Sequence, residues 1–228
     1  MKTEDRGEGR LATTALDHLV VAAATLAQGA EWCEATLGVT PGPGGSHALF
    51  GTHNRLLKIA GANWPDAYLE IIAIDPGAPP PARPRWFGLD DPALQSQLVT
   101  AGPRLIHAVV RSTMLDTHRC GLVAVGCKPG DPVSASRETQ QGRLSWQILV
   151  PADGRLDCDG ALPTLIQWVG AHPTAQMPDS AVTLRTLSLR GVPDRARDVL
   201  RLRGVDFCAG SGPALRATLA TPRGLIEI

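Results

Sequence analysis

The sequence lacks any apolar run approaching the roughly 20 residues that a helix needs to cross a bilayer. It also lacks the features of a secretory signal, because residues 1–10 are polar, mixed in charge and contain no apolar segment. We therefore expect a cytoplasmic protein with no membrane partner, and residues 1–13 are expected to form only a polar leader.

An excess of charge of either sign is also missing. Lysine plus arginine and aspartate plus glutamate both number 22, so the formal net charge is zero. A surface that binds nucleic acid usually shows as an excess of basic residues. The composition therefore argues against a nucleic-acid partner.

Several chemical motifs are absent as well. The five cysteines are odd in number, scattered and without a CxxC pair, so they predict neither a disulfide framework nor a zinc ribbon. There is no glycine-rich phosphate loop of the familiar spacings and no Gly-x-Ser-x-Gly elbow. These absences argue against a nucleotide cofactor and against serine hydrolase chemistry.

The sequence does contain an internal echo. Residues 16–21 (LDHLVV) recur 89 positions later as residues 105–110 (LIHAVV). Each copy places one histidine, His18 or His107, near the start of an apolar run that is typical of a strand. Because strand side chains alternate between faces, each histidine is predicted to face away from the apolar residue that follows it. Two equivalent histidines indicate a duplicated unit.

The pattern around each copy predicts an α+β fold in which strand, helix and three strands follow one another twice. In the first copy Thr25 suits a helix cap and Gly38 a helix end, whereas residues 40–45 are predicted to be a loop. The predicted division is a leader (1–13), a βαβββ module (14–76), a proline-rich connector (77–103), a second βαβββ module (104–170) and a partial third module (171–228) packed on the same domain.

Two pairs of residues in these modules could carry chemistry. Glu70 interrupts an apolar fourth strand, and a buried carboxylate is costly unless it is paired or coordinates a cation. The corresponding place in the second module is assigned to Gln167. His18, His107 and Glu70 would form a set of two histidines and one carboxylate, which suits divalent iron, manganese, nickel or zinc. The alternative is that the histidines are satisfied strand residues and Glu70 faces solvent.

Other polar and aromatic residues allow two interpretations each. His53 could line a pocket mouth and donate to substrate oxygens, or it could belong to a turn. Trp146 and Trp168 on predicted strands could form the wall of an apolar cavity, or they could pack in the core. Arg137 could bind a carboxylate or lie on an exposed strand face. His118 and His172 are expected at the surface.

The modules, the histidine in LDHLVV and the glutamate in YLEIIA (residues 68–73) together resemble the vicinal oxygen chelate superfamily, which includes glyoxalase I, extradiol dioxygenases and bleomycin-resistance proteins. More narrowly, GTHN (residues 51–54) with GALPTLIQW (residues 160–168) resembles its glyoxalase-like domain branch. The resemblance covers about residues 14–228. It implies that each module curls into half of a barrel built from mixed sheets.

The resemblance also implies that metal ligands come from the first and fourth strands of both modules. By position, it assigns the metal ligands His18, Glu70 and His107. Together with the residue patterns above, the expected catalytic residues are Glu70 and His53, and the expected pocket residues are Gln167, Trp146 and Trp168. Gln167 departs from the pattern, because an acid often stands at its position. The implied function is a lyase, isomerase or dioxygenase that uses a divalent metal (Fe, Mn, Ni or Zn) on a small oxygen-rich substrate, with a homodimer as the expected assembly. The alternative is a metal-free protein that binds or sequesters a small molecule.

Overall fold

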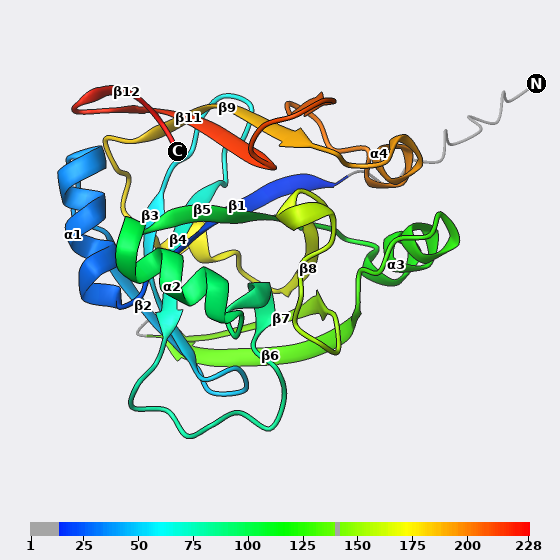
Figure 1. The fold of residues 1–228 in the computed structure, drawn as a ribbon, viewed down its shortest axis with the longest axis horizontal. Coiled ribbons are helices and arrows are strands. Elements are labelled where there is room, and N and C mark those ends of the chain that lie inside the picture. Colours follow the sequence, from blue (N-terminus) through cyan, green and yellow to red (C-terminus); the bar gives the residue numbers. More distant parts are fainter. Residues whose placement is uncertain (1–13, 140–141) are drawn as a thin grey trace, which may run out of the picture.

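The two halves of the chain form one eight-stranded sheet (Figure 1). The computed structural model describes residues 14–139 and 142–228, so the predicted leader lies outside the described residues. The order of the strands is β2-β3-β4-β1-β5-β8-β7-β6. The strands of the first half are β1 (Ala15–Ala22), β2 (Gly42–His47), β3 (Thr52–Lys58) and β4 (Tyr68–Ile74). Those of the second half are β5 (Arg104–Arg111), β6 (Asp131–Thr139), β7 (Gly142–Val150) and β8 (Thr164–Val169).

The two halves have the same topology. In each half the first strand pairs in parallel with the fourth, β1 with β4 and β5 with β8, while the remaining pairs are antiparallel. A helix follows each first strand, α1 (Leu26–Leu37) in the first half and α3 (Leu115–Ala124) in the second. The α+β fold of paired βαβββ modules is therefore confirmed.

The halves join where β1 and β5 pair antiparallel at the centre of the sheet. Leu19 pairs with Ala108, His18 pairs with Val109, and Val20 pairs with His107. The two halves are therefore related by a local twofold about the Leu19–Ala108 pair, and the histidines lie in the pairs immediately before and after it. This register pairs the two segments that repeat in the sequence, residues 16–21 and 105–110, with each other.

A β-bulge precedes each histidine. The pairing with β5 passes from Leu16 directly to His18, and the pairing with β1 passes from Leu105 directly to His107. The extra residues are Asp17 and Ile106. An extra residue in a strand turns two consecutive side chains toward the same face, which simple alternation does not allow. Asp17 thus shares the inner face of the sheet with His18.

The eight-stranded sheet curls until its two edge strands, β2 and β6, lie beside each other. The prediction of a loop over residues 40–45 was wrong, since β2 runs from Gly42 to His47. An edge strand tolerates Pro43, because one side of the strand needs no hydrogen-bond donor. Gly44 is required there, because a Cβ atom would lie 2.1 Å from Oδ1 of Asn54.

The connector between the halves contains regular structure, which the prediction of a proline-rich linker missed. A 3₁₀ turn, η1 (Trp86–Gly88), is followed by helix α2 (Pro92–Ala101). The Asp91 side chain caps α2 by accepting from the Ala93 N–H at 2.9 Å, and Pro92 occupies the first turn, where no N–H is needed. The turn places Trp86 and Phe87 against the inner face of the sheet, in a core that also contains Val20, Ile72 and Val109.

The remaining residues form a second, four-stranded sheet with the order β10-β9-β11-β12. Its elements are β9 (Thr183–Arg190), α4 (Asp194–Leu200), β10 (Asp206–Cys208), β11 (Leu215–Thr221) and β12 (Gly224–Glu227). Its first strand pairs in parallel with its second, not with its fourth, so it does not repeat the module topology. It shares a hydrophobic core with the outer face of the large sheet, where Leu187 and Leu189 join Leu19 and Val21.

None of the helices in the described residues is long and apolar enough to cross a membrane. All five cysteines are free thiols.

Candidate active site

A small cavity of about 30 Å³ lies inside the curled sheet. Its lining combines aromatic rings with a few charged and polar groups. The lining residues are His18, His47, Asn54, Leu56, Tyr68, Glu70, Trp86, Phe87, Arg137, Trp146, Ile148, Ile166 and Trp168. Five of the nine Phe, Trp and Tyr residues of the chain are in this set. The scarce aromatic residues are thus concentrated around one site.

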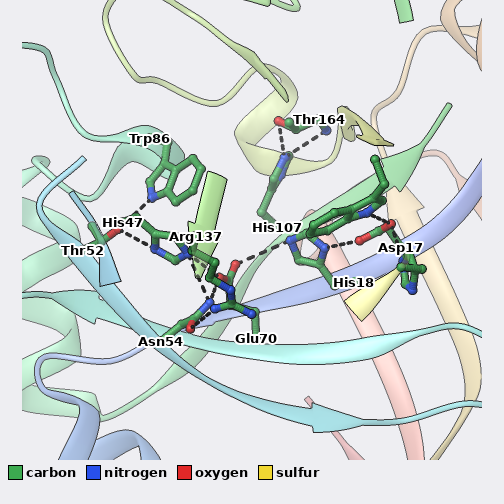
Figure 2. A network of polar contacts seen from close by, with 12 residues as sticks. Asp17, His18, His47, Thr52, Asn54, Glu70, Trp86, His107, Arg137 and Thr164 are labelled. Carbon is green, nitrogen blue, oxygen red and sulfur yellow. Dashed lines mark hydrogen bonds and ion pairs between the residues drawn. The ribbon is translucent and has the colours of Figure 1, made fainter. Parts of the chain in front are cut away.

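The central feature of the cavity is a row of three ionisable side chains, Asp17, His18 and Glu70 (Figure 2). The His18 Nδ1–H donates to Asp17 Oδ1 at 2.7 Å, and His18 Nε2 lies 3.5 Å from Glu70 Oε2. Burial by itself would lower the pKa of His18, but the two carboxylates raise it to about 9. His18 is therefore an imidazolium at neutral pH, held between two anions.

Asp17 organises this end of the site, although it is fully buried. Its Oδ2 accepts from Trp168 Nε1 at 2.8 Å and from His172 Nε2 at 2.9 Å, in addition to the bond from His18. Burial would raise the pKa of Asp17, yet the hydrogen bonds from His172 and His18 hold it well below its ordinary value. One buried carboxylate therefore fixes the orientation of three ring side chains from three different segments.

Glu70 is held from its other side by Asn54. Asn54 Nδ2 donates to Glu70 Oε1 at 2.6 Å, while Asn54 Oδ1 accepts from the backbone N–H of Gly45 at 2.8 Å. Burial would raise the pKa of Glu70, but the His18 cation first, and then His47 and Asn54, lower it to about 2. Glu70 is consequently ionised, and its two oxygens face different partners.

His47 is the neutral counterpart of His18. Its Nδ1 lies 3.1 Å from Thr52 Oγ1, and its Nε2 lies 3.4 Å from Asn54 Nδ2 and 4.0 Å from Glu70 Oε1. Burial lowers the pKa of His47 to about 4 despite the attraction of Glu70. With Nδ1–H donating to Thr52, His47 Nε2 is left as an acceptor on the cavity side.

His107 makes contacts of a different kind. Its Nδ1–H donates to the Gly160 carbonyl at 2.7 Å, and its Nε2 accepts from the Thr164 N–H at 3.1 Å, with Thr164 Oγ1 at 2.8 Å. Burial lowers the pKa of His107 to about 4. His107 is therefore a neutral side chain whose two ring nitrogens are both engaged by β8 and the turn before it.

The counterpart of Glu70 in the second half is Thr164, not Gln167. Glu70 pairs with Val20 in register, and Thr164 pairs with Val109, the residue that is equivalent to Val20. The prediction that matched Gln167 to Glu70 was wrong, because it aligned the two fourth strands three residues out of register. The Thr164 hydroxyl contacts Nε2 of His107, just as the Glu70 carboxylate contacts Nε2 of His18.

These contacts decide how well the expected metal ligands fit a metal ion. A ligating histidine must present a free ring nitrogen to the metal. His107 has none, and Thr164 supplies no carboxylate. Within residues 14–139 and 142–228, no group of three or more His, Cys, Asp and Glu side chains is arranged to hold a metal ion. His18, Glu70 and His107 therefore do not fit a metal as a set.

Two other expected site residues lie outside the cavity. Gln167 points to the opposite face of β8, where its Oε1 accepts from the Leu115 N–H at the start of α3 at 3.1 Å. His53 also points away, and its Nδ1 lies 3.9 Å from Asp75 Oδ1. The placement of Gln167 in the pocket and of His53 at its mouth is therefore contradicted by the geometry.

Trp146 and Trp168 do line the cavity, with ring centroids 5.3 Å apart. Their role in binding a ligand stays a prediction.

Several residues of the site were missed or misplaced by sequence reasoning. Asp17 was hidden by the bulge, since strict alternation turns it away from His18. Trp86 lies in the connector, where no strand pattern marks it. His172 was expected at the surface, but it bonds to the buried Asp17 and its side chain is only 16% exposed. His118, also expected at the surface, is buried next to Ser112.

The sequence contained a signal that could have identified Asn54 as a residue of the site. It lies in the GTHN segment that carried the resemblance, two residues from Thr52 on the same face of β3. That spacing would have pointed to Asn54 in place of His53.

Comparison with known families supports the fold. The family described as glyoxalase-like domain matches residues 16–202. The chain therefore belongs to the glyoxalase-like domain family. A comparison with curated proteins finds no match.

Similar solved structures are found at low sequence identity. A hypothetical protein from Staphylococcus aureus is 15% identical, with 89% of this chain and 88% of that chain covered and a TM-score of 0.56. A methylmalonyl-CoA epimerase from Streptomyces coelicolor, in complex with 2-nitronate-propionyl-CoA, is 20% identical over 70% of this chain and 99% of its own, with a TM-score of 0.41. The epimerase from Mycobacterium tuberculosis is 19% identical, with 71% and 91% covered and a TM-score of 0.38.

Proposed function

We propose that this protein binds a small organic molecule in the cavity beside His18 and Glu70, and that this binding needs no metal ion. The observation that carries the proposal is the contrast between the two histidines. His18 faces an aromatic-lined cavity as a cation, while His107 is closed off by Gly160 and Thr164. Concave sites with apolar walls and a few fixed polar groups are typical of small-molecule pockets.

The walls define what such a molecule would contact. Trp86 and Phe87 enter from the connector, and Trp146 and Trp168 come from neighbouring strands. Their faces suit an aromatic or apolar group of the ligand. On the polar side, His18 Nε2–H is a donor and Glu70 Oε2 an acceptor, 3.5 Å apart. A carbonyl or hydroxyl group of a ligand could bond to either.

The same two groups could also transfer a proton. His18 carries the proton that a general acid needs at neutral pH, and Glu70 is an ionised carboxylate beside it. Asp17 would hold the imidazolium in position while the proton moves. Binding alone and binding with proton transfer both use this arrangement, and the first is required for the second.

The divalent-metal-dependent lyase, isomerase or dioxygenase implied by the family is the second candidate. One observation favours it: Nε2 of both His18 and His47 lies near the Glu70 carboxylate, at 3.5 and 4.0 Å. His47 would then have to replace His107 as the second histidine, and Asn54 would have to release Glu70.

Ligand-induced thermal stabilisation tests the proposal. A panel of small aromatic carbonyl compounds is screened with and without EDTA against the wild type, Trp146→Phe and the matched control Trp32→Phe, since Trp32 packs on the other core. We expect stabilisation that survives EDTA, falls in Trp146→Phe and persists in Trp32→Phe. Stabilisation that EDTA abolishes, and that Zn²⁺ or Mn²⁺ restores, would favour the metal-dependent candidate instead.

A further inference from the structure

Arg137 of β6 stands between the cavity and a much larger outer groove. The groove has a volume of about 770 Å³, and Leu56 and Arg137 line both spaces. The inner cavity of about 30 Å³ is close to the size of a single water molecule. An organic ligand therefore needs more room than this cavity alone offers, and displacement of the Arg137 side chain would join the cavity to the groove.

The position of Arg137 coincides with the place where the curled sheet closes without a ladder. β2 and β6 are the two ends of the strand order, yet they lie beside each other. Arg137 crosses this seam next to Gly45, where a Cβ atom would lie 3.1 Å from Arg137 Nη1. Its hydrogen bond to Asn54 Oδ1 is long, at 3.4 Å (Figure 2). The side chain is thus lightly held, and moving it opens the cavity without breaking strand pairing.

Arg137 also differs from the other charged residues around the groove. Lys58 pairs with Asp179 at 2.7 Å, and Glu138 pairs with Arg143 at 3.9 Å. In the part of the chain that the structure describes, no carboxylate lies within 4 Å of the Arg137 guanidinium. Glu70, a carboxylate that lines the same cavity, is held by His18 and Asn54. The Arg137 cation is available to an incoming anion.

We propose that Arg137 is both the gate and the anchor of the site, and that the ligand is a small monocarboxylic acid. Its apolar or aromatic part would enter the cavity, and its carboxylate would stay at the seam, bound by the planar guanidinium. Among the described residues that line the groove, Arg137 is the one base without a carboxylate partner, which suits a singly charged anion. This inference rests on the proposed function, because it requires that the cavity accept the ligand's body.

Three phenyl compounds of the same size and different charge test the proposal. Phenylacetate, phenylacetamide and 2-phenylethylamine are titrated at pH 7 while tryptophan fluorescence is followed, since three of the five tryptophans line the cavity. The proteins compared are the wild type, Arg137→Gln, Arg137→Lys and the control Arg143→Gln, which removes an exposed arginine of the next strand. In the wild type we expect phenylacetate to bind about ten-fold more tightly than phenylacetamide, as for a charge-assisted hydrogen bond.

The variants separate the possible outcomes. In Arg137→Gln, the affinity for phenylacetate should fall to the affinity for phenylacetamide, and the affinity for phenylacetamide should stay unchanged. Arg137→Lys should retain part of the preference for phenylacetate. Arg143→Gln should bind all three compounds as the wild type does. Equal affinity for all three compounds, or a preference for the amine, would overturn the role of Arg137 but leave the binding cavity intact. If none of the compounds changes the fluorescence of the wild type, the proposed function fails and this inference fails with it.

Discussion

The two halves of the sheet show how one scaffold can hold a charged and a neutral version of the same arrangement. In the first half, Asp17 occupies the bulge and Glu70 faces the histidine, so His18 is a cation. In the second half, Ile106 occupies the bulge and Thr164 faces the histidine, so His107 is neutral. The backbone is common to both. Two side-chain differences decide which of the two histidines carries a charge.

The largest difference in unfolding free energy between variants of the two halves should appear when the residue in each bulge is changed. Asp17→Asn removes the buried charge that His18, Trp168 and His172 share, and breaking such a pair typically costs about 3–5 kcal/mol of unfolding free energy. The matched change in the other bulge, Ile106→Val, only trims a core side chain and should cost about 1 kcal/mol. Urea denaturation of both variants measures the two losses. Equal losses would mean that Asp17 packs like Ile106 and does not organise charge.

The pH dependence of stability should differ in sign between His18 and His107. The folded pKa of His18 is raised from 6.5 to about 9, so its stabilisation is complete below pH 6.5 and is lost as the pH rises toward 9. The folded pKa of His107 is lowered from 6.5 to about 4, so its contribution is present above pH 6.5 and is lost as the pH falls toward 4. Each of the two effects is about 3 kcal/mol.

Denaturation curves recorded from pH 4 to pH 9 test this difference with one variant from each half. His18→Gln should remove the loss of stability on the alkaline side. His107→Gln should reduce the loss on the acidic side, to which His47 and the two carboxylates beside His18 also contribute. A His18→Gln protein that keeps the alkaline loss would show that the imidazolium does not belong to the folded state.

A smaller effect is expected from the partner that faces each histidine. Glu70→Gln removes a carboxylate beside His18, so the pKa of His18 should fall and the protein should lose about 2 kcal/mol. Thr164→Val removes a neutral partner of His107 and should cost about 1 kcal/mol, with no rise in the pKa of His107. Imidazole nitrogen chemical shifts, followed by NMR against pH, report both pKa values. An unchanged His18 titration in Glu70→Gln would leave Asp17 as the whole cause.

The smallest effect concerns the residue that was first matched to Glu70. Gln167→Ala should cost about 1 kcal/mol, because Gln167 caps the first N–H of α3, and it should leave ligand affinity unchanged. Glu70→Gln should weaken the affinity. Both variants can be titrated with the compound that stabilises the wild type most. A loss of affinity in Gln167→Ala would restore that residue to the site.

The sequence predicted the duplicated architecture, because apolar strand patterns, the Thr25 cap and Gly38 are local signals that recur in order. It also predicted His18 and Glu70, since an ionisable residue in an apolar strand is conspicuous. Register was harder to predict. A bulge changes which residues share a face, and a shift of three residues in β8 exchanged Thr164 for Gln167. Neither can be seen without the hydrogen-bonded neighbour.

Tertiary contacts explain the remaining differences. The strand β2 forms from a glycine- and proline-rich segment because it is needed only at an edge and because Gly44 must pass close to Asn54. Trp86 reaches the cavity through a turn in the connector, and His172 reaches Asp17 from a loop after β8. These residues come from segments whose own composition marks them as loops. Only the folded chain brings them to one place.

The paired bulges also bear on how the two halves of the sheet arose. An extra residue stands immediately before the histidine in both first strands, and the two strands meet about the Leu19 and Ala108 pair. The simplest history is that a single ancestral module already carried the bulge and the histidine before it was copied and fused. The copies differ at equivalent places, with Asp17 against Ile106 and Glu70 against Thr164. The side chains of the two halves have diverged as those of duplicated genes do, although both halves remain in a single folded unit.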